Sequence, residues 1–170
     1  MSTIAAPQRS LTARQKDIII ERTFDLPVTL VWKAWTESES LKRWWGPKGY
    51  TCTYSNIDLN PGGKYLHCMK SSLGEKFWST GFYDEIIPFK TLSFIDSFSD
   101  NKGNMIPASD LNLPGKWPMM LPISIELEET GHNTHMVLRH EGIPSEMYDV
   151  CIKSWNQSFD KLEVSMLTLQ

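Results

Sequence analysis

The stretch SEMYDVCIKSWNQSFDKLEVSMLTL, residues 145–169, decides the fold of this chain. Pro144 fits an extended chain just before a helix, and Ser145 is a suitable N-cap residue. A helix over all of these residues would be about 37 Å long. Its apolar stripe needs a broad apolar partner, which we expect to be a curved sheet formed by the preceding residues. The stripe returns at intervals of three and four, at Met147, Val150, Cys151, Trp155, Phe159, Leu162, Met166 and Leu169.

The residues before this helix form strand-like runs separated by turn signals. Glycine, proline and asparagine gather at 60–63, glycine lies within 72–75, and glycine and asparagine lie within 130–133. The clearest half-buried strand has Ile123, Ile125 and Leu127 on one side and serine and glutamate on the other. The pattern predicts strands at 51–59, 64–71, 77–87, 91–98, 122–129 and 134–142.

The amino-terminal part of the chain adds a tail, a strand and two short helices. Residues 1–14 show little periodicity and are predicted to be a flexible tail. A strand begins near Lys16, and helices follow at about 28–35 and 37–41. Tight turns indicate an antiparallel sheet, and grouped elements indicate an α+β fold. We therefore expect one domain over residues 15–170, in which six to seven strands curve around the long carboxy-terminal helix.

Composition and charge exclude several classes of protein. A net charge of -3 and a pI near 5.8 give no basic surface for nucleic acid. No apolar run approaches the ~20 residues of a membrane span, and the amino terminus lacks a signal-peptide pattern, so a cytoplasmic location is expected. Three widely spaced cysteines argue against a disulfide framework, and four scattered histidines argue against a metal site. No cofactor is predicted.

The ordered set of motifs resembles the activator-of-Hsp90-ATPase-homologue-like (AHSA1-like) domains of the START-like, or SRPBCC, superfamily. The resemblance covers residues 17–169 and implies a helix-grip fold with a pocket for a hydrophobic or amphipathic molecule. It does not imply one activity, because this superfamily contains carriers, receptors and cyclases. The motifs that carry the resemblance are Phe24, Pro27, Val31–Thr36, Trp44–Pro47, Asp58, Pro61–Gly63, Gly81, Glu85–Ile86, Asn101–Asn104, Thr134, Leu138, His140, Gly142 and Trp155.

Aromatic residues beside a few polar ones suggest the lining of a pocket between sheet and helix. Strand alternation puts His140 on the same face as Met136 and Leu138, toward the helix. For each residue the alternative is a purely structural place in the core. Which side of the strand near Gly81 faces inward stays open, because a glycine within a strand can mark a bulge. The predicted ligand-binding residues are Tyr65, His67, Trp78, Phe82, Phe94, Phe98, Trp117, His140, Trp155 and Phe159.

Three functions fit these residues. The first is binding of a small hydrophobic ligand without catalysis, under an apolar cover formed by residues 99–121. The second is a cyclase-like, aromatase-like or proton-transfer enzyme in which His140 is the catalytic residue. The third is a chaperone co-factor-like interaction module, which the resemblance supports less because it extends to chaperone-binding proteins only at the domain level. A homodimer is compatible with all three. The pattern favours a binding protein over an enzyme.

Overall fold

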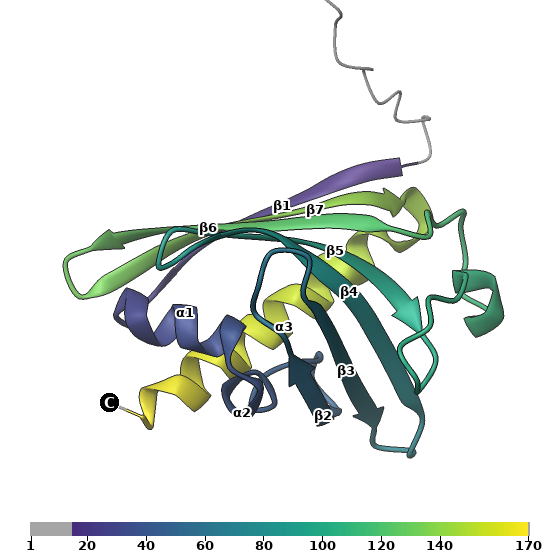
Figure 1. Ribbon diagram of the computed structural model, residues 1–170, viewed down its shortest axis with the longest axis horizontal. Helices are drawn as coiled ribbons and strands as arrows, with labels where there is room; N and C mark the ends of the chain where they lie inside the picture. Colours follow the sequence, from purple (N-terminus) through teal and green to yellow (C-terminus); the bar gives the residue numbers. More distant parts are fainter. Residues whose placement is uncertain (1–14, 170) are drawn as a thin grey trace, which may run out of the picture.

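The computed structural model describes residues 15–169 and shows a curved sheet with its helices on one side (Figure 1). The segment predicted to be a flexible tail lies outside this range. The strands are β1 (Gln15–Phe24), β2 (Tyr50–Ile57), β3 (Lys64–Ser71), β4 (Lys76–Ile87), β5 (Thr91–Ser99), β6 (Leu121–Thr130) and β7 (Asn133–Pro144). The helices are α1 (Val28–Thr36), α2 (Ser38–Leu41) and α3 (Tyr148–Leu167), with short 3-10 turns η1 (Ala108–Leu111) and η2 (Ser145–Met147).

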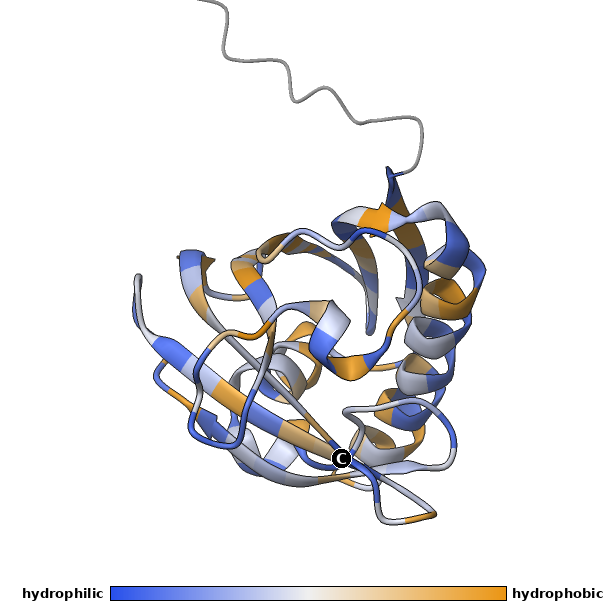
Figure 2. Cartoon of the chain, turned by 90° about the vertical axis from the view of Figure 1, so that its right-hand side faces the viewer, coloured by the Kyte–Doolittle hydropathy of each residue, from blue (hydrophilic) through white to orange (hydrophobic). Residues whose placement is uncertain are grey.

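All seven strands form one antiparallel sheet in the order β1-β7-β6-β5-β4-β3-β2. Strands β2 to β7 follow one another as neighbours, and β1 closes the series beside β7. Hydrophilic and hydrophobic residues alternate along the strands, as Figure 2 shows, because successive side chains point to opposite faces of a sheet. The predicted α+β helix-grip fold is confirmed, and the predicted strands agree with the structure within a few residues at each end.

Helix α3 crosses the concave side of the sheet (Figure 1), but it begins later than predicted. Residues 145–147 form the 3-10 turn η2, and no side-chain hydrogen bond caps α3, so the α-helix is about 30 Å long. Phe159 is fully buried, as predicted, but Val150 is 54% exposed. At about 100° per residue, Val150 lies on the opposite side of the helix from Phe159. Leu169 lies beyond the end of the helix and is 38% exposed. Val150 and Leu169 were therefore wrongly assigned to the apolar stripe.

A cluster of tryptophans fixes the short helices to the core. Trp44 is fully buried, and its Nε1–H donates a 2.9 Å hydrogen bond to the carbonyl oxygen of Ala34. The ring of Trp35 lies 4.8 Å from Trp44 and 6.2 Å from Phe159, measured between centroids. The burial of this large ring in the core, and not contact with a ligand, explains the position of Trp44.

Candidate functional site

The inner face of the sheet carries a polar group that crosses three strands. Tyr65 on β3 is paired with Gly81 on β4, and Gly81 is paired with Asp96 on β5. The Tyr65 hydroxyl group donates a hydrogen bond to the Asp96 carboxyl group. A Cβ atom on Gly81 would lie 1.8 Å from the Ile95 carbonyl oxygen and 2.6 Å from the Tyr65 hydroxyl oxygen. Glycine at this position therefore allows the phenol side chain to pass over β4 and reach the carboxyl group.

Asp96 is an unusual carboxyl group because it lies on the inner face of the sheet and is only partly exposed. Burial raises its pKa from 3.8 to about 7, although the hydrogen bond from Tyr65 opposes this shift. Burial and the adjacent carboxylate also hold the pKa of Tyr65 well above its usual range. No cation within residues 15–169 forms an ion pair with Asp96. Near neutral pH the Asp96 carboxyl group can therefore donate or accept a hydrogen bond, while Tyr65 stays a donor.

His140 presents a hydrogen-bond donor that no group within residues 15–169 uses. Its Nδ1 atom accepts a 3.1 Å hydrogen bond from the Nε1–H of Trp155 on α3. An indole nitrogen can only donate, so the proton of the neutral imidazole is on Nε2. Burial lowers the pKa of His140 to about 3, which keeps the ring neutral. The Nε2 atom is buried and has no hydrogen-bond partner among residues 15–169. Buried polar groups without a partner are rare.

His67 lies at the other side of the same inner face. Its ring stacks on Tyr65 at a centroid distance of 4.7 Å, and Trp45 lies 5.1 Å away. Its Nδ1 atom is 2.9 Å from the Ser55 hydroxyl oxygen. Burial lowers the pKa of His67 to about 3, so this imidazole is also neutral. Two neutral imidazoles and one carboxyl group of raised pKa therefore supply the polar chemistry of this face.

Aromatic rings fill one end of the space between the sheet and α3. Trp155 stacks on Phe159 at 5.5 Å and lies 5.8 Å from Trp45. Phe159 also contacts Phe24 and Trp44 and is fully buried. Phe159 therefore packs against the Trp155 ring from within the core, whereas Trp155 itself is partly exposed.

The segment from Ser99 to Leu121 covers the other end. Ser99 bridges to Met105, and the Ile106 amide donates to the Phe98 carbonyl oxygen. The Trp117 ring lies edge-on against Phe98, with centroids 5.2 Å apart, and its Nε1–H donates to the Pro114 carbonyl oxygen. Both rings are partly exposed. The predicted cover is therefore an ordered segment that packs on Phe98.

The sequence matches the family described as Activator of Hsp90 ATPase homolog 1-like protein over residues 25–166. The chain belongs to this family. The match includes α1, α2, six of the strands and nearly all of α3.

Solved structures similar to this AHSA1-like protein come from several bacteria. A protein from Nitrosomonas europaea is 24% identical, with a TM-score of 0.73 over 93% of this chain and 97% of that chain. One from Chromobacterium violaceum is 25% identical, with a TM-score of 0.72 over 87% and 94% of the two chains. The AHSA1 protein from Silicibacter pomeroyi is 18% identical, with a TM-score of 0.72 over 91% and 100%. No curated protein matches this sequence.

Two predicted site residues of the AHSA1-like domain lie on the outer face of the sheet. The rings of Tyr83 and Phe94 are in contact on the inner face, so alternation turns Phe82 and Trp78 outward. Trp78 accordingly packs against Tyr54. The physical reason is a β-bulge between Tyr83 and Ile86, which reverses the alternation along β4. Trp78 and Phe82 therefore lie away from the inner face, on the side of the strand that the sequence left open near Gly81.

The other predicted residues lie on the inner face of the sheet, on the helix α3 that packs against it, or on the cover, namely Tyr65, His67, Phe94, Phe98, Trp117, His140, Trp155 and Phe159. Asp96 was missed, because one aspartate in an alternating strand gives no signal until its neighbours are known. Trp45 was not among the predicted ligand-binding residues, yet it contacts both His67 and Trp155.

Three further features of this AHSA1-like protein concern metal ligands, membrane spans and pockets. Within residues 15–169, histidine, cysteine, aspartate and glutamate side chains nowhere gather in a group of three that could hold a metal ion. In the same part of the chain, no helix has the length and hydropathy that crossing a membrane requires. Two pockets, of about 560 and 150 Å³, open on the outer face and at one end of the sheet, away from the Tyr65–Asp96 pair.

Proposed function

We propose that this AHSA1-like domain binds a small amphipathic molecule between β3–β5 and the amino-terminal half of α3, beneath the segment from Ser99 to Leu121. The apolar part of the molecule would lie against Phe98, Trp117 and Trp155, whose rings are partly exposed. Phe94 and Phe159 would support it from behind. Tyr65, His67 and His140 from the predicted set, together with Asp96, would supply the polar contacts. A cytoplasmic location belongs to the same proposal.

The unused Nε2–H of His140 carries this proposal. A buried donor without an acceptor costs about 1–3 kcal/mol, and a ligand with a carbonyl, ether or hydroxyl oxygen would remove that cost. Because the Nε2 atom is closed to solvent, a ligand reaches it only if a neighbouring side chain moves.

The geometry supports His140 as a donor and not as a catalytic base. The imidazole lone pair is on Nδ1 and already accepts the Trp155 hydrogen bond. A pKa near 3 also makes the ring a weak base at neutral pH. Asp96, with a pKa of about 7, is the better candidate if a proton is transferred here. The enzyme hypothesis therefore moves from His140 to Asp96.

Native mass spectrometry of the freshly purified protein tests the ligand proposal. We expect a bound small molecule in the wild type and in the outer-face control Trp78→Phe, but a strongly reduced amount in Asp96→Asn and His140→Phe. These two substitutions keep most of the side-chain volume and remove a carboxyl group or a donor. A protein that never carries a small molecule, or four proteins that carry it equally, would contradict the proposal.

A second candidate, a chaperone co-factor-like interaction, is favoured by the dense packing behind Trp155. Phe159, Trp35 and Trp44 leave that end of the interior filled with aromatic rings, so an interaction through the outer surface would not need the inner face. Pull-down with Hsp90, followed by measurement of its ATPase rate with and without this protein, tests this function. An unchanged rate and no retained protein would exclude it.

A further inference from the structure

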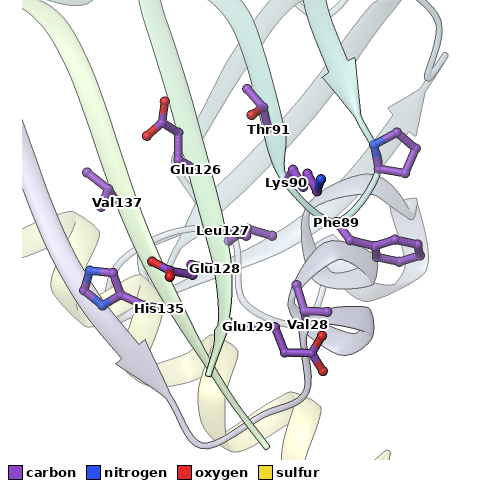
Figure 3. A pocket seen from close by; sticks show the side chains of 11 residues that line it. Val28, Phe89, Lys90, Thr91, Glu126, Leu127, Glu128, Glu129, His135 and Val137 are labelled. Carbon is purple, nitrogen blue, oxygen red and sulfur yellow. The ribbon is translucent and has the colours of Figure 1, made fainter. Parts of the chain in front are cut away.

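A groove lies at the carboxy-terminal end of β6 (Figure 3). Its volume is about 560 Å³. The turn between β4 and β5, the first residue of α1 and the outer side chains of β6 and β7 enclose it. We call it the β6 groove. Its lining residues are Val28, Pro88, Phe89, Lys90, Thr91, Glu126, Leu127, Glu128, Glu129, His135 and Val137.

The groove exists because β6 is longer than its neighbour β5 at this end. The β5–β6 pairing stops at Thr91 and Glu126, and the last contact is a 2.7 Å hydrogen bond from the Leu127 amide to the Lys90 carbonyl oxygen. On its other side, β6 stays paired with β7 as far as Thr130. Residues 128–130 therefore have no strand partner on the β5 side within the described part of the chain. A free strand edge is a template for an added strand.

The lining of the β6 groove contains apolar and acidic side chains, and Glu129 lies beside Val28 (Figure 3). Val28 and Phe89 lie together on one side, and Leu127 lies at the base (Figure 3). Glu126 and Glu128 project from the outer face of β6 (Figure 3). Glu129 is a third carboxylate, and Lys90 is the only lysine or arginine among the lining residues. The groove therefore combines an apolar wall with a surplus of negative charge.

Phe89 is held at the mouth of this groove by a strained turn. The Lys90 amide donates a 3.0 Å hydrogen bond to the Ile87 carbonyl oxygen, so Pro88 and Phe89 are the central residues of a β-turn. Phe89 has a φ of 66°, a conformation that glycine or asparagine adopts more easily than an aromatic residue. Its ring is 45% exposed and contacts Trp32 at 6.0 Å. Glycine would fit the backbone better but would remove the exposed ring from the groove.

We propose that the β6 groove binds a short extended segment of a partner protein in which basic and apolar residues alternate. The segment adds to the free edge of β6 at residues 128–130. Its alternate side chains then point to opposite faces, as in any strand. The basic side chains meet Glu126 and Glu128 on the outer face, and the apolar ones meet Phe89 and Val28. The negative charge and the apolar wall of the groove favour this occupant over a neutral small molecule.

A fluorescein-labelled peptide of sequence Lys-Val-Lys-Leu-Lys-Val-Lys, blocked at both ends, tests this proposal by fluorescence anisotropy. We expect saturable binding that weakens as salt is added, because exposed charges are screened. A peptide with glutamate in place of lysine should not bind. A peptide with N-methyl groups on alternate residues should also fail to bind, because it cannot form the strand hydrogen bonds.

Matched variants locate the binding. Phe89→Gly and Glu128→Lys should each weaken peptide binding by about tenfold, whereas Phe89→Trp should bind like the wild type. Leu73→Ala and Glu75→Lys are the controls, because they change an exposed apolar and an exposed acidic residue in the β3–β4 turn. A thermal melt of each variant checks that it folds. Glu128→Lys keeps the test valid if Phe89→Gly does not fold.

Three results would overturn the proposal. The first is equal binding of the lysine and glutamate peptides. The second is peptide binding that is unchanged in both Phe89→Gly and Glu128→Lys. The third is a dimer of the wild-type protein in sedimentation that becomes a monomer in Phe89→Gly. The last result would make a second copy of this chain the occupant. None of them depends on the inner face, so this proposal and the proposed ligand site can fail independently.

Discussion

The Tyr65 hydroxyl group donates a hydrogen bond to the Asp96 carboxyl group across Gly81, and so three strands meet in one polar contact. The contact lies on an otherwise aromatic face and has no cation beside it among residues 15–169. A carboxyl group in such surroundings costs stability when it is ionised. The ionisation of Asp96 therefore makes the stability of the fold depend on pH. Under the proposed function, the same carboxyl group contacts the ligand.

Asp96→Asn is expected to stabilise the protein at pH 8 but not at pH 4.5. The pKa of Asp96 is raised from 3.8 to about 7, so between these values the folded state keeps a proton that the unfolded state has lost. Stability therefore falls as pH rises through this range and stays low above it. Because Asp96 is partly exposed, we expect a gain of about 1–2 kcal/mol at pH 8. Urea unfolding at both pH values measures it.

The exposed residue Asp84 provides the control for this prediction. Asp84→Asn should change the free energy of unfolding by less than about 0.5 kcal/mol at either pH. If Asp96→Asn gave the same gain at pH 4.5 as at pH 8, ionisation of Asp96 would not be the cause.

Acid is expected to destabilise the fold through His67 and His140. Burial lowers both pKa values from 6.5 to about 3. Below pH 6.5 the unfolded chain therefore binds protons that the folded chain does not bind. Their contribution is present above pH 6.5 and is lost as pH falls toward 3. The raised pKa of Asp96 has the opposite effect on stability, but it is one group and the histidines are two. The expected net loss is about 2–3 kcal/mol between pH 6.5 and 4.5.

Melting temperatures recorded from pH 7 to pH 4.5 measure this effect. The double variant His67→Gln/His140→Gln should show a flatter curve than the wild type. His132→Gln, at an exposed turn, should leave the curve unchanged. A wild-type protein as stable at pH 4.5 as at pH 6.5 would show that these two histidines are accessible to protons in the folded state.

Gly81→Ala is expected to be one of the most damaging substitutions of a small residue. The new Cβ atom would collide with the Ile95 carbonyl oxygen at 1.8 Å and with the Tyr65 hydroxyl oxygen at 2.6 Å. Since the first of these belongs to the backbone, β4 and β5 would have to separate, at a cost of about 3 kcal/mol or more. Chemical denaturation measures the loss.

Gly49→Ala separates the collision from the general cost of replacing a glycine. Gly49 has a φ of 90°, but nothing lies within 4 Å of the point that a Cβ atom would occupy. It should therefore cost about 1 kcal/mol through backbone strain alone. Equal losses for the two variants would mean that the strands accommodate a methyl group at Gly81.

Phe159→Ala is expected to destabilise the protein by about 3–5 kcal/mol. Its ring is fully buried and contacts Phe24, Trp35, Trp44 and Trp155, so a cavity would remain where sheet and helix meet. Val164→Ala on the exposed side of α3 should cost less than about 0.5 kcal/mol. Guanidinium unfolding of both variants measures the difference, and a small loss for Phe159→Ala would imply that Trp155 moves into the space.

The architecture was predictable because it rests on periodic burial. The alternation of Ile123, Ile125 and Leu127 places β6, and the spacing of Phe159, Leu162 and Met166 identifies the buried face of α3. Period 2 and period 3.6 are properties of the local backbone, so each is visible in the sequence wherever one face is buried. The orientation of His140 toward the helix follows from the same rule and is confirmed by its hydrogen bond to Trp155.

Only the tertiary structure decided which polar groups meet. The bulge between Tyr83 and Ile86 moves Trp78 and Phe82 to the outer face. The nearby Gly81 indicated that a bulge was possible but not where it lies. Asp96 acquires its role from Gly81 and Tyr65, which lie 15 and 31 positions away in the chain. Burial, pKa and pairing depend on such distant neighbours. Local periodicity therefore determined the elements, and long-range packing determined the chemistry between them.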